Sequence, residues 1–163
     1  MGRVVTKDNN RRYNEARAEM DRVRHGPTVR IGFRGPEGLA KHPGSPDVTI
    51  VEVATFNEFG TSNIPERSFI RSTMDENRNA LLQTNKQLFF EIVVGSMTTE
   101  RALNILGMKM KALIQKKITD LRTPPNAPST IRQKGSSNPL IDTGTMRQAV
   151  TYKVSMTGGD EAA

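Results

Sequence analysis

The sequence predicts an α+β fold, a small, mostly antiparallel β-sheet packed against a long two-helix hairpin, with an N-terminal helix and long extended loops. Segments 28–35 and 48–56 alternate apolar and polar residues with period two, as half-buried strands do. Two later runs, 71–94 and 100–121, repeat apolar residues at helical spacing. The order of these elements places the helices on one face of the sheet.

The N-terminal segment 1–27 is predicted to form a basic helix that ends at a Gly-Pro pair. Asp8 or Asn9 can cap its start, because these side chains accept hydrogen bonds from first-turn amides. Residues 1–34 hold nine Lys and Arg against four Asp and Glu, which is most of the net charge of +7. Such a surface attracts polyanions, nucleic acid first among them. A solvated helix of mixed charge is the alternative.

The strands 28–35 and 48–56 are expected to pair with each other across the loop 36–47. That loop holds three Pro and two Gly, which disfavour regular structure. A second loop, 123–144, is rich in Pro, Ser, Asn and Gly. It is too long for an idle connector, because long ordered loops in compact domains usually have a function or lie at an interface. Alternation in segment 146–156 then predicts the last strand.

The two helices are expected to form a hairpin with a continuous apolar seam. Gly95 can take the left-handed conformation that ends the first helix. Ser96 or Thr98 can then cap the second helix. The methionines in these helices are interpreted as core residues.

The chain of 163 residues is expected to form one domain over 28–155, followed by a flexible tail at 156–163. It has no cysteine, which excludes disulfides and thiolate chemistry. The only histidines, His25 and His42, are too few and too far apart in sequence for a metal site. The longest apolar run is too short to span a bilayer. The N-terminus has no apolar run of the signal-peptide type. No catalytic residue, cofactor or metal is predicted.

Asp142-Thr143-Gly144 has the residues of an aspartic protease active-site loop. That chemistry needs two carboxylates sharing a proton. One chain could supply one Asp to a symmetric dimer, but in that family most of the fold follows the motif, and here little sequence remains after it. The alternative is a turn into the last strand, in which Gly144 tolerates positive φ. Asp142 or Thr143 could also cap a short helical turn that begins near Thr145.

Two segments, 57–71 and 124–154, resemble the tail-completion and neck proteins of long-tailed bacteriophages. The resembling pieces are Asn57-Glu58-Phe59-Gly60-Thr61, Ile64-Pro65 with Arg67 and Phe69, Pro125 with Ile131 and Lys134-Gly135, and Pro139-Leu140-Ile141-Asp142-Thr143-Gly144 with Met146-Arg147. The two blocks flank the helical hairpin, and the resemblance covers roughly residues 28 to 155.

The resemblance implies a non-enzymatic structural protein of the virion. Such proteins form rings, often of six copies, at the junction between the DNA-filled head and the tail, where they complete or terminate the tail or form a collar. The implied partners are other copies of the chain, a head-completion or adaptor protein and the tail tube protein, with the tail sheath as a further candidate. The implied location is the virion, after assembly in the host cytoplasm. A basic DNA-binding accessory protein is the alternative.

Charged and aromatic residues of the two segments are the candidates for contacts between subunits or rings: Glu58, Phe59, Arg67, Phe69, Arg71, Lys134, Asp142 and Arg147. A ring subunit presents two unlike surfaces to its neighbours, so charge pairs across that contact are expected. Local pairing of Glu58, Arg67 and Arg71 within one subunit is the alternative.

Overall fold

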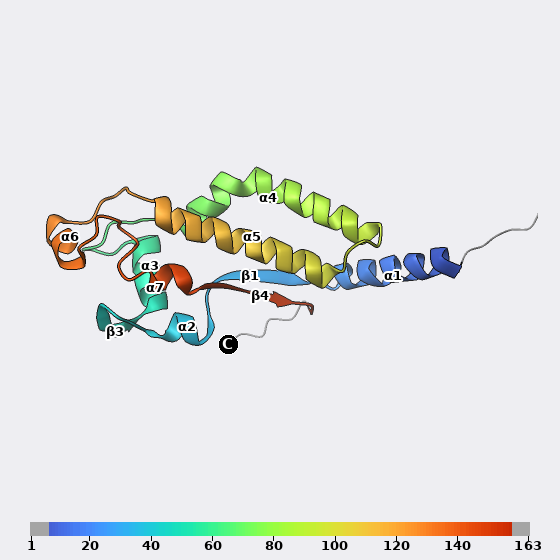
Figure 1. Ribbon diagram of the computed structural model, residues 1–163, viewed down its shortest axis with the longest axis horizontal. Coiled ribbons are helices and arrows are strands. Elements are labelled where there is room, and N and C mark those ends of the chain that lie inside the picture. The colour runs from blue at the N-terminus through green and yellow to red at the C-terminus, as the bar shows by residue number, and fades with distance from the viewer. Residues whose placement is uncertain (1–6, 158–163) are drawn as a thin grey trace, which may run out of the picture. The chain divides into compact units, whose positions relative to one another are not determined.

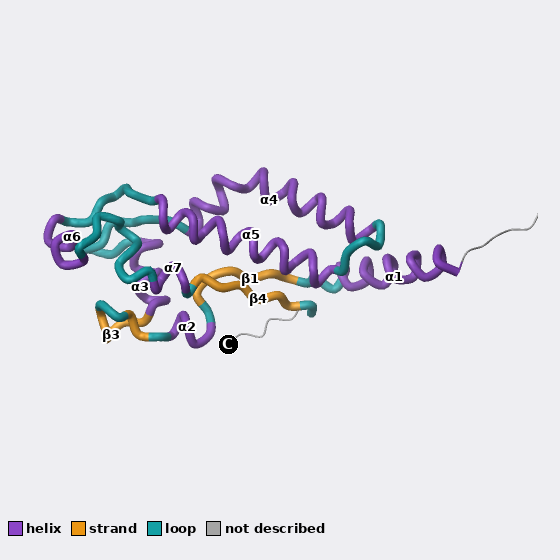
Figure 2. Tube along the Cα trace, in the orientation of Figure 1, coloured by secondary structure: helices purple, strands orange, loops and turns teal. Residues whose placement is uncertain are grey.

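The computed structural model describes residues 7–157, with side chains from residue 11 onward (Figure 1). The side chains of the predicted caps Asp8 and Asn9, and residues 158–163 of the predicted tail, lie outside this description. The fold mixes helices with short strands, as predicted (Figure 2). In chain order the described elements are α1 (Lys7–Arg24), β1 (Thr28–Phe33), α2 (Gly35–Leu39), β2 (Lys41–His42), β3 (Ser45–Thr49), α3 (Ile50–Phe59), α4 (Ile70–Val93), α5 (Thr99–Asp120), α6 (Pro128–Lys134), α7 (Thr145–Gln148) and β4 (Val150–Ser155).

The chain divides into two compact units. Among the described residues, the first comprises 7–30, 79–108 and 153–157, and the second comprises 31–78 and 109–152. The long helices α4 and α5 contribute to both. The sequence did not predict this division, and the expected domain limits at residues 28 and 155 remain predictions.

The first unit contains α1, the second half of α4 and the first half of α5. Its core consists of Leu88, Ile92 and Ala102, with Val23, Met97, Ile105 and Leu106 packed around them. The predicted ends of the helix pair are confirmed: Gly95 has a φ of 73°, and Arg101 N donates to Thr98 Oγ1 at 3.2 Å. Glu19 connects α1 to the start of α5 within this unit, because its carboxylate accepts a hydrogen bond of 2.7 Å from Thr99 N.

The second unit holds the larger core, built from α3, α7, the start of α4, the end of α5 and residues of β1 and β4. Its buried apolar residues are Ile50, Ala54, Phe69, Ile114, Ile118, Leu140, Met146, Ala149 and Val150. Ile31 and Phe33 of β1 pack against them, and the rings of Phe33 and Phe69 meet edge to face with centroids 6.1 Å apart. The packing of the helices against strand residues agrees with the predicted fold class.

The predicted strand 48–56 is wrong, because most of it forms helix α3. Thr49 and Glu52 make a capping box: Thr49 Oγ1 accepts from Glu52 N at 3.3 Å, and Glu52 Oε2 accepts from Thr49 N at 2.7 Å. Ile50 and Ala54, four residues apart, are buried on one helix face. The preference of β-branched residues for strands is weak and depends on context, so the cap and this burial outweigh it.

The strand pairing therefore differs from the prediction. β1 pairs with β4, which confirms both as strands, although residues 146–148 of the predicted last strand belong to α7. β2 and β3 form a separate antiparallel pair with Lys41 opposite Thr49. The predicted loop 36–47 thus contains most of α2 and the β2–β3 hairpin, and the predicted loop 123–144 contains α6. None of the described helices is long and apolar enough to cross a membrane.

Candidate functional site

The two segments that carry the resemblance meet at Arg67, in the second unit. Its Nε donates to the carbonyl oxygen of Pro124 at 2.8 Å. One terminal nitrogen donates to the Pro125 carbonyl at 3.0 Å and to Asn126 Oδ1 at 3.1 Å, and the other donates to Asn57 Oδ1 at 3.1 Å. The side chain is buried, and burial lowers its pKa. Arg67 therefore ties the 57–71 segment to the loop after α5 through neutral oxygens alone.

Glu58 fixes the start of α4. Its carboxylate accepts hydrogen bonds from the backbone N–H groups of Phe69 at 2.8 Å, Ile70 at 2.8 Å and Arg71 at 3.0 Å, and from Ser68 Oγ at 3.0 Å. These amides are the unpaired donors that every helix start leaves, and the helix dipole favours a negative charge there. Burial by itself raises the pKa of this carboxyl, but the backbone hydrogen bonds outweigh it and lower the pKa below its ordinary value.

A small exposed cluster lies beside Glu58. The guanidinium of Arg71 stacks over the ring of Phe59, with 4.9 Å between its central carbon and the ring centroid. The same guanidinium bonds to Glu58 Oε1 at 3.1 Å and to Glu66 Oε1 at 2.7 Å. Phe59 is 62% exposed.

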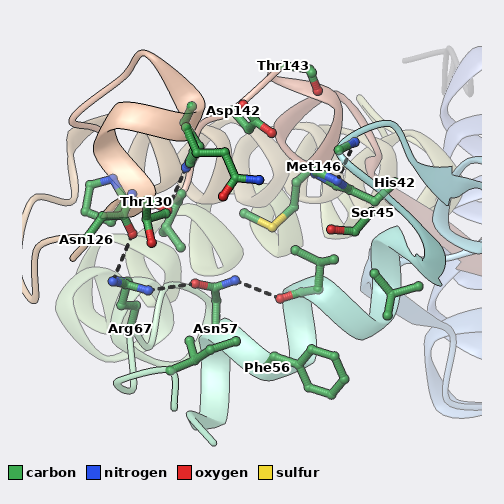
Figure 3. A pocket seen from close by; sticks show the side chains of 18 of the residues that line it. His42, Ser45, Phe56, Asn57, Arg67, Asn126, Thr130, Asp142, Thr143 and Met146 are labelled. Carbon is green, nitrogen blue, oxygen red and sulfur yellow. Dashed lines mark hydrogen bonds between the residues drawn. The ribbon is translucent and has the colours of Figure 1, made fainter. Parts of the chain in front are cut away.

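A pocket of about 520 Å³ opens on the second unit, with walls from α3, the 63–67 segment, the β2–β3 hairpin, α6 and the residues before α7 (Figure 3). Its apolar lining residues include Val48, Val53, Phe56, Ile64, Leu140 and Met146. Its polar lining residues include His42, Asn57, Arg67, Asn126, Gln133, Lys134 and Asp142. Ligand sites commonly combine an apolar wall with a few placed polar groups in this way.

Lys134 gives the pocket a second cation. Its Nζ donates to the carbonyl oxygens of Asn138 at 3.2 Å and Pro139 at 3.4 Å. Burial lowers the pKa of Lys134. The negative charge of Asp142 raises this pKa, and the positive charge of Arg67 lowers it further. Neither Lys134 nor Arg67 has a carboxylate within ion-pair distance among the described residues. The pocket therefore has a partly desolvated positive charge.

The Asp142-Thr143-Gly144 segment forms a turn. Gly144 has a φ of 82° and precedes α7, as the turn interpretation expected. The predicted side-chain cap by Asp142 is wrong: its side chain is exposed and makes no hydrogen bond in the described part of the chain, because Gly144 itself occupies the cap position. Thr143 Oγ1 instead accepts a long bond of 3.4 Å from Thr145 N.

The eight predicted contact residues fall into two groups. Glu58, Arg67 and Phe69 are buried and bonded or packed within the chain. Glu58 pairs with Arg71, as the alternative of local pairing expected, whereas Arg67 bonds only to neutral oxygens in the described part of the chain. The remaining five are partly or fully exposed: Phe59, Arg71, Lys134, Asp142 and Arg147. Contact of any of them with another subunit remains a prediction.

Sequence reasoning missed the pocket walls supplied by the β2–β3 hairpin and by α6. The sequence predicts loops over most of the hairpin and over α6. A signal for α6 was present, because Pro128 begins the helix and Gly135 ends it in the left-handed conformation. For α3 the signal was the spacing from Thr49 to Glu52, which is that of a capping box.

Comparison of the chain with protein-family models, with curated proteins and with solved structures gave no match in any of the three.

Proposed function

We propose that this protein is a structural component of a bacteriophage neck. It forms a ring, of six copies in the form the resemblance implies, that completes or terminates the tail and joins it to the DNA-filled head. The supporting observation is that the two resembling segments are hydrogen-bonded to each other in the folded chain. Arg67 of the first segment bonds to Pro124, Pro125 and Asn126 at the start of the second, 57 to 59 residues later in the chain.

The apolar surface of the first unit supports a role in assembly. The second half of α4 and the residue after it expose five large apolar side chains: Leu82, Phe89, Phe90, Val93 and Val94. Between residues 79 and 94 the only charged side chains are Lys86 and Glu91. Depletion of charge together with exposed aromatic residues is typical of the core of a protein–protein interface. Neighbouring copies, an adaptor protein of the head or the tube protein of the tail are the partners that the proposal assigns.

The alternative is a DNA-binding accessory protein, and the ion pairs within helix α1 count against it. Three of its arginines are paired with acids on the same helix: Arg11 with Glu15, Arg22 with Glu19, and Arg24 with Asp21. Such pairing reduces the free positive charge that phosphate binding requires. A ring that surrounds DNA needs only weak, sequence-independent contact with it.

Electron microscopy of particles from a phage that lacks this gene tests the proposal. Filled heads beside separate tails would support a joining role, and overlong tails would support tail termination. Normal infectious particles would refute both. The alternative is tested by binding of the purified protein to duplex DNA, where a steep fall of log K with log salt would support a DNA-binding protein.

A further inference from the structure

The pocket of the second unit brings an apolar wall and two cations to one place. Arg67 and Lys134 both line it, as do Phe56 and Met146. We propose that this pocket is a binding site for a small organic acid, in which an apolar group is joined to a single carboxylate. The inference does not depend on the proposed function, and it concerns the second unit by itself.

Arg67 is a buried cation that lines this pocket. The residue is 5% exposed, and its four hydrogen bonds all go to neutral oxygens, of which Figure 3 marks the one on Asn57. A guanidinium has five N–H groups, so one is left without a partner in the described part of the chain. Buried charges are usually paired with an opposite charge, because the loss of hydration is unfavourable. An anion in the pocket would supply the negative charge that Arg67 lacks.

Lys134 brings a second positive charge to the pocket. Its Nζ donates to two backbone carbonyl oxygens, and because an ammonium has three N–H groups, one is left without a partner among the described residues. The side chain of Asn126 connects the two cations. Its Oδ1 accepts from Arg67 at 3.1 Å, and its Nδ2 donates at 3.4 Å to the Asn138 carbonyl oxygen, which also accepts from Lys134. The two cations are therefore held by one hydrogen-bonded network.

The charge of the pocket favours a ligand with one negative charge. Asp142 is the only acid among the described residues that line it, so two cations and one carboxylate leave an excess of one positive charge. His42 carries no proton at Nδ1 in this arrangement, because Nδ1 accepts a hydrogen bond from Gly44 N at 3.1 Å. Two remaining N–H donors and one excess charge suit a carboxylate, which has two oxygens and one charge. A phosphate group has more charge and more acceptor oxygens than this site can satisfy.

The apolar wall determines what else the ligand contains. Val53, Phe56 and Met146 are among the residues that form it. The volume of about 520 Å³ lies within the range of roughly 300–1,000 Å³ that is typical of sites for small organic molecules. An acid as small as acetate would leave this wall in contact with water, whereas a phenyl group would cover part of it. Such burial is favourable in proportion to the apolar area removed from water.

Three probes test this class of ligand on the wild-type protein: phenylacetate, its neutral counterpart phenylacetamide, and acetate. Titrations followed by amide NMR measure each dissociation constant. We expect phenylacetate to bind with a Kd of about 1–10 mM or tighter, as ligands of about ten heavy atoms do, and to shift the amide signals of Asn126 and Thr130. It should bind roughly tenfold or more tightly than the other two probes.

The probes can contradict the inference in three ways. Binding of phenylacetamide as tight as that of phenylacetate would overturn the role of the charge. Equally tight binding of acetate would overturn the role of the apolar wall. Phenylacetate that leaves the signals of the pocket residues unshifted would overturn the site as a whole.

Three substitutions test the two charges whose side chains are not fully buried. Lys134→Gln removes the charge but keeps an amide that can donate to a carbonyl oxygen, and it should weaken phenylacetate binding roughly tenfold. Asp142→Asn removes the competing carboxylate and should tighten binding roughly two- to fivefold, a gain that a purely structural role would not produce. Arg132→Gln is the matched control, because Arg132 lies on the same helix α6, is exposed and does not line the pocket.

Thermal melting of each variant without probe shows whether it has remained folded. Unchanged affinity of a folded Lys134→Gln, weaker binding by Asp142→Asn, or an equal loss in Arg132→Gln would each overturn the inference. If Lys134→Gln does not fold, Asp142→Asn and the three probes still decide the question.

The source of the carboxylate is tested with the dipeptide acetyl-Gly-Phe, which places the same phenyl group and carboxylate at the end of a peptide chain. Binding tenfold tighter than that of phenylacetate would identify the chain end of a partner protein as the ligand, and weaker binding would identify a free acid. Failure of phenylacetate and of the dipeptide alike would overturn the site. None of these results changes the outcome of the gene-deletion experiment, so the proposed function stands or falls separately.

Discussion

Replacement of Glu58 by Gln tests the central feature of the second unit, the capping of α4 by a buried carboxylate. Gln has nearly the same shape, but one of its two terminal groups is an amide donor. Glu58 Oε2 accepts from the N–H groups of Phe69 and Ile70, and an NH₂ group in its place accepts from neither. If the Gln oxygen takes the other position, Arg71 N and the Arg71 side chain lose their acceptor instead.

The magnitude follows from the two donors left without a partner. A buried donor that loses its acceptor costs about 1–3 kcal/mol. The N–H of Phe69 is fully buried and that of Ile70 is partly buried, so we expect a loss of about 2–4 kcal/mol in the free energy of unfolding. For a chain of this size, a loss of that magnitude lowers Tm by roughly 4–16 °C.

Urea unfolding followed by far-UV circular dichroism measures this change, with a lower midpoint and an unchanged m value expected. Glu66→Gln is the matched control, because its carboxylate is exposed and pairs with the same Arg71. Surface ion pairs of this kind contribute about 0–1 kcal/mol. Equal stability of Glu58→Gln and the wild type would refute the reasoning.

The lowered pKa of Glu58 also predicts a dependence on pH. Because its folded-state pKa lies below the unfolded value of about 4.3, the carboxylate stabilises the fold above that value. This contribution is lost as pH falls through the folded-state pKa. The wild type should therefore lose its advantage over Glu58→Gln on acidification below about pH 4.3, and at neutral pH the difference should be constant.

Three further predictions concern single positions. Gly60 has φ 74° and ψ 171°, and a Cβ there would lie 3.0 Å from Glu66 N, so Gly60→Ala should cost about 1–3 kcal/mol in urea unfolding; a stable variant would contradict this backbone assignment. Asp142→Ala should change Tm by less than about 2 °C, because its exposed side chain makes no cap hydrogen bond to α7. A larger decrease of Tm in scanning calorimetry would show that Asp142 does cap this helix. Glu19→Ala should destabilise the first unit by about 1–3 kcal/mol, because it removes the acceptor of buried Thr99 N, and amide exchange at the start of α5 should become faster; unchanged exchange there would count against this cap.

The sequence by itself determined the elements whose signal is local and repeated. Apolar spacing located α4 and α5 to within about one residue, and Gly95 and Thr98 marked their boundary. Period-two alternation located β1 and β4. In the two helices the apolar spacing and the burial of Leu88, Ile92 and Ile114 in the folded chain agree, so the pattern could be interpreted without knowledge of the neighbours.

Tertiary structure decided what local preference could not. Segment 50–59 has β-branched residues that favour a strand, but burial of Ile50 and Ala54 in the core together with the Thr49 cap makes it a helix. Strand preferences differ by only about 1 kcal/mol over their whole scale, so burial of a few side chains reverses them. The partner of β1 depended on the same outcome, because the segment expected to pair with it was no longer a strand.

In the candidate site, too, the sequence identified individual residues, and the tertiary structure decided how they are placed. The sequence identified Glu58, Arg67 and Lys134 as residues of interest, but it gave no sign that Glu58 and Arg67 are buried or that Lys134 faces the same pocket as Arg67. Arg67 contacts Pro124 across 57 positions of sequence, and no local pattern encodes such a distance. Local patterns determine where helices begin and end. The positions at which buried charges meet depend on packing, because a charge without a partner in the interior is too unfavourable for the fold to leave it so.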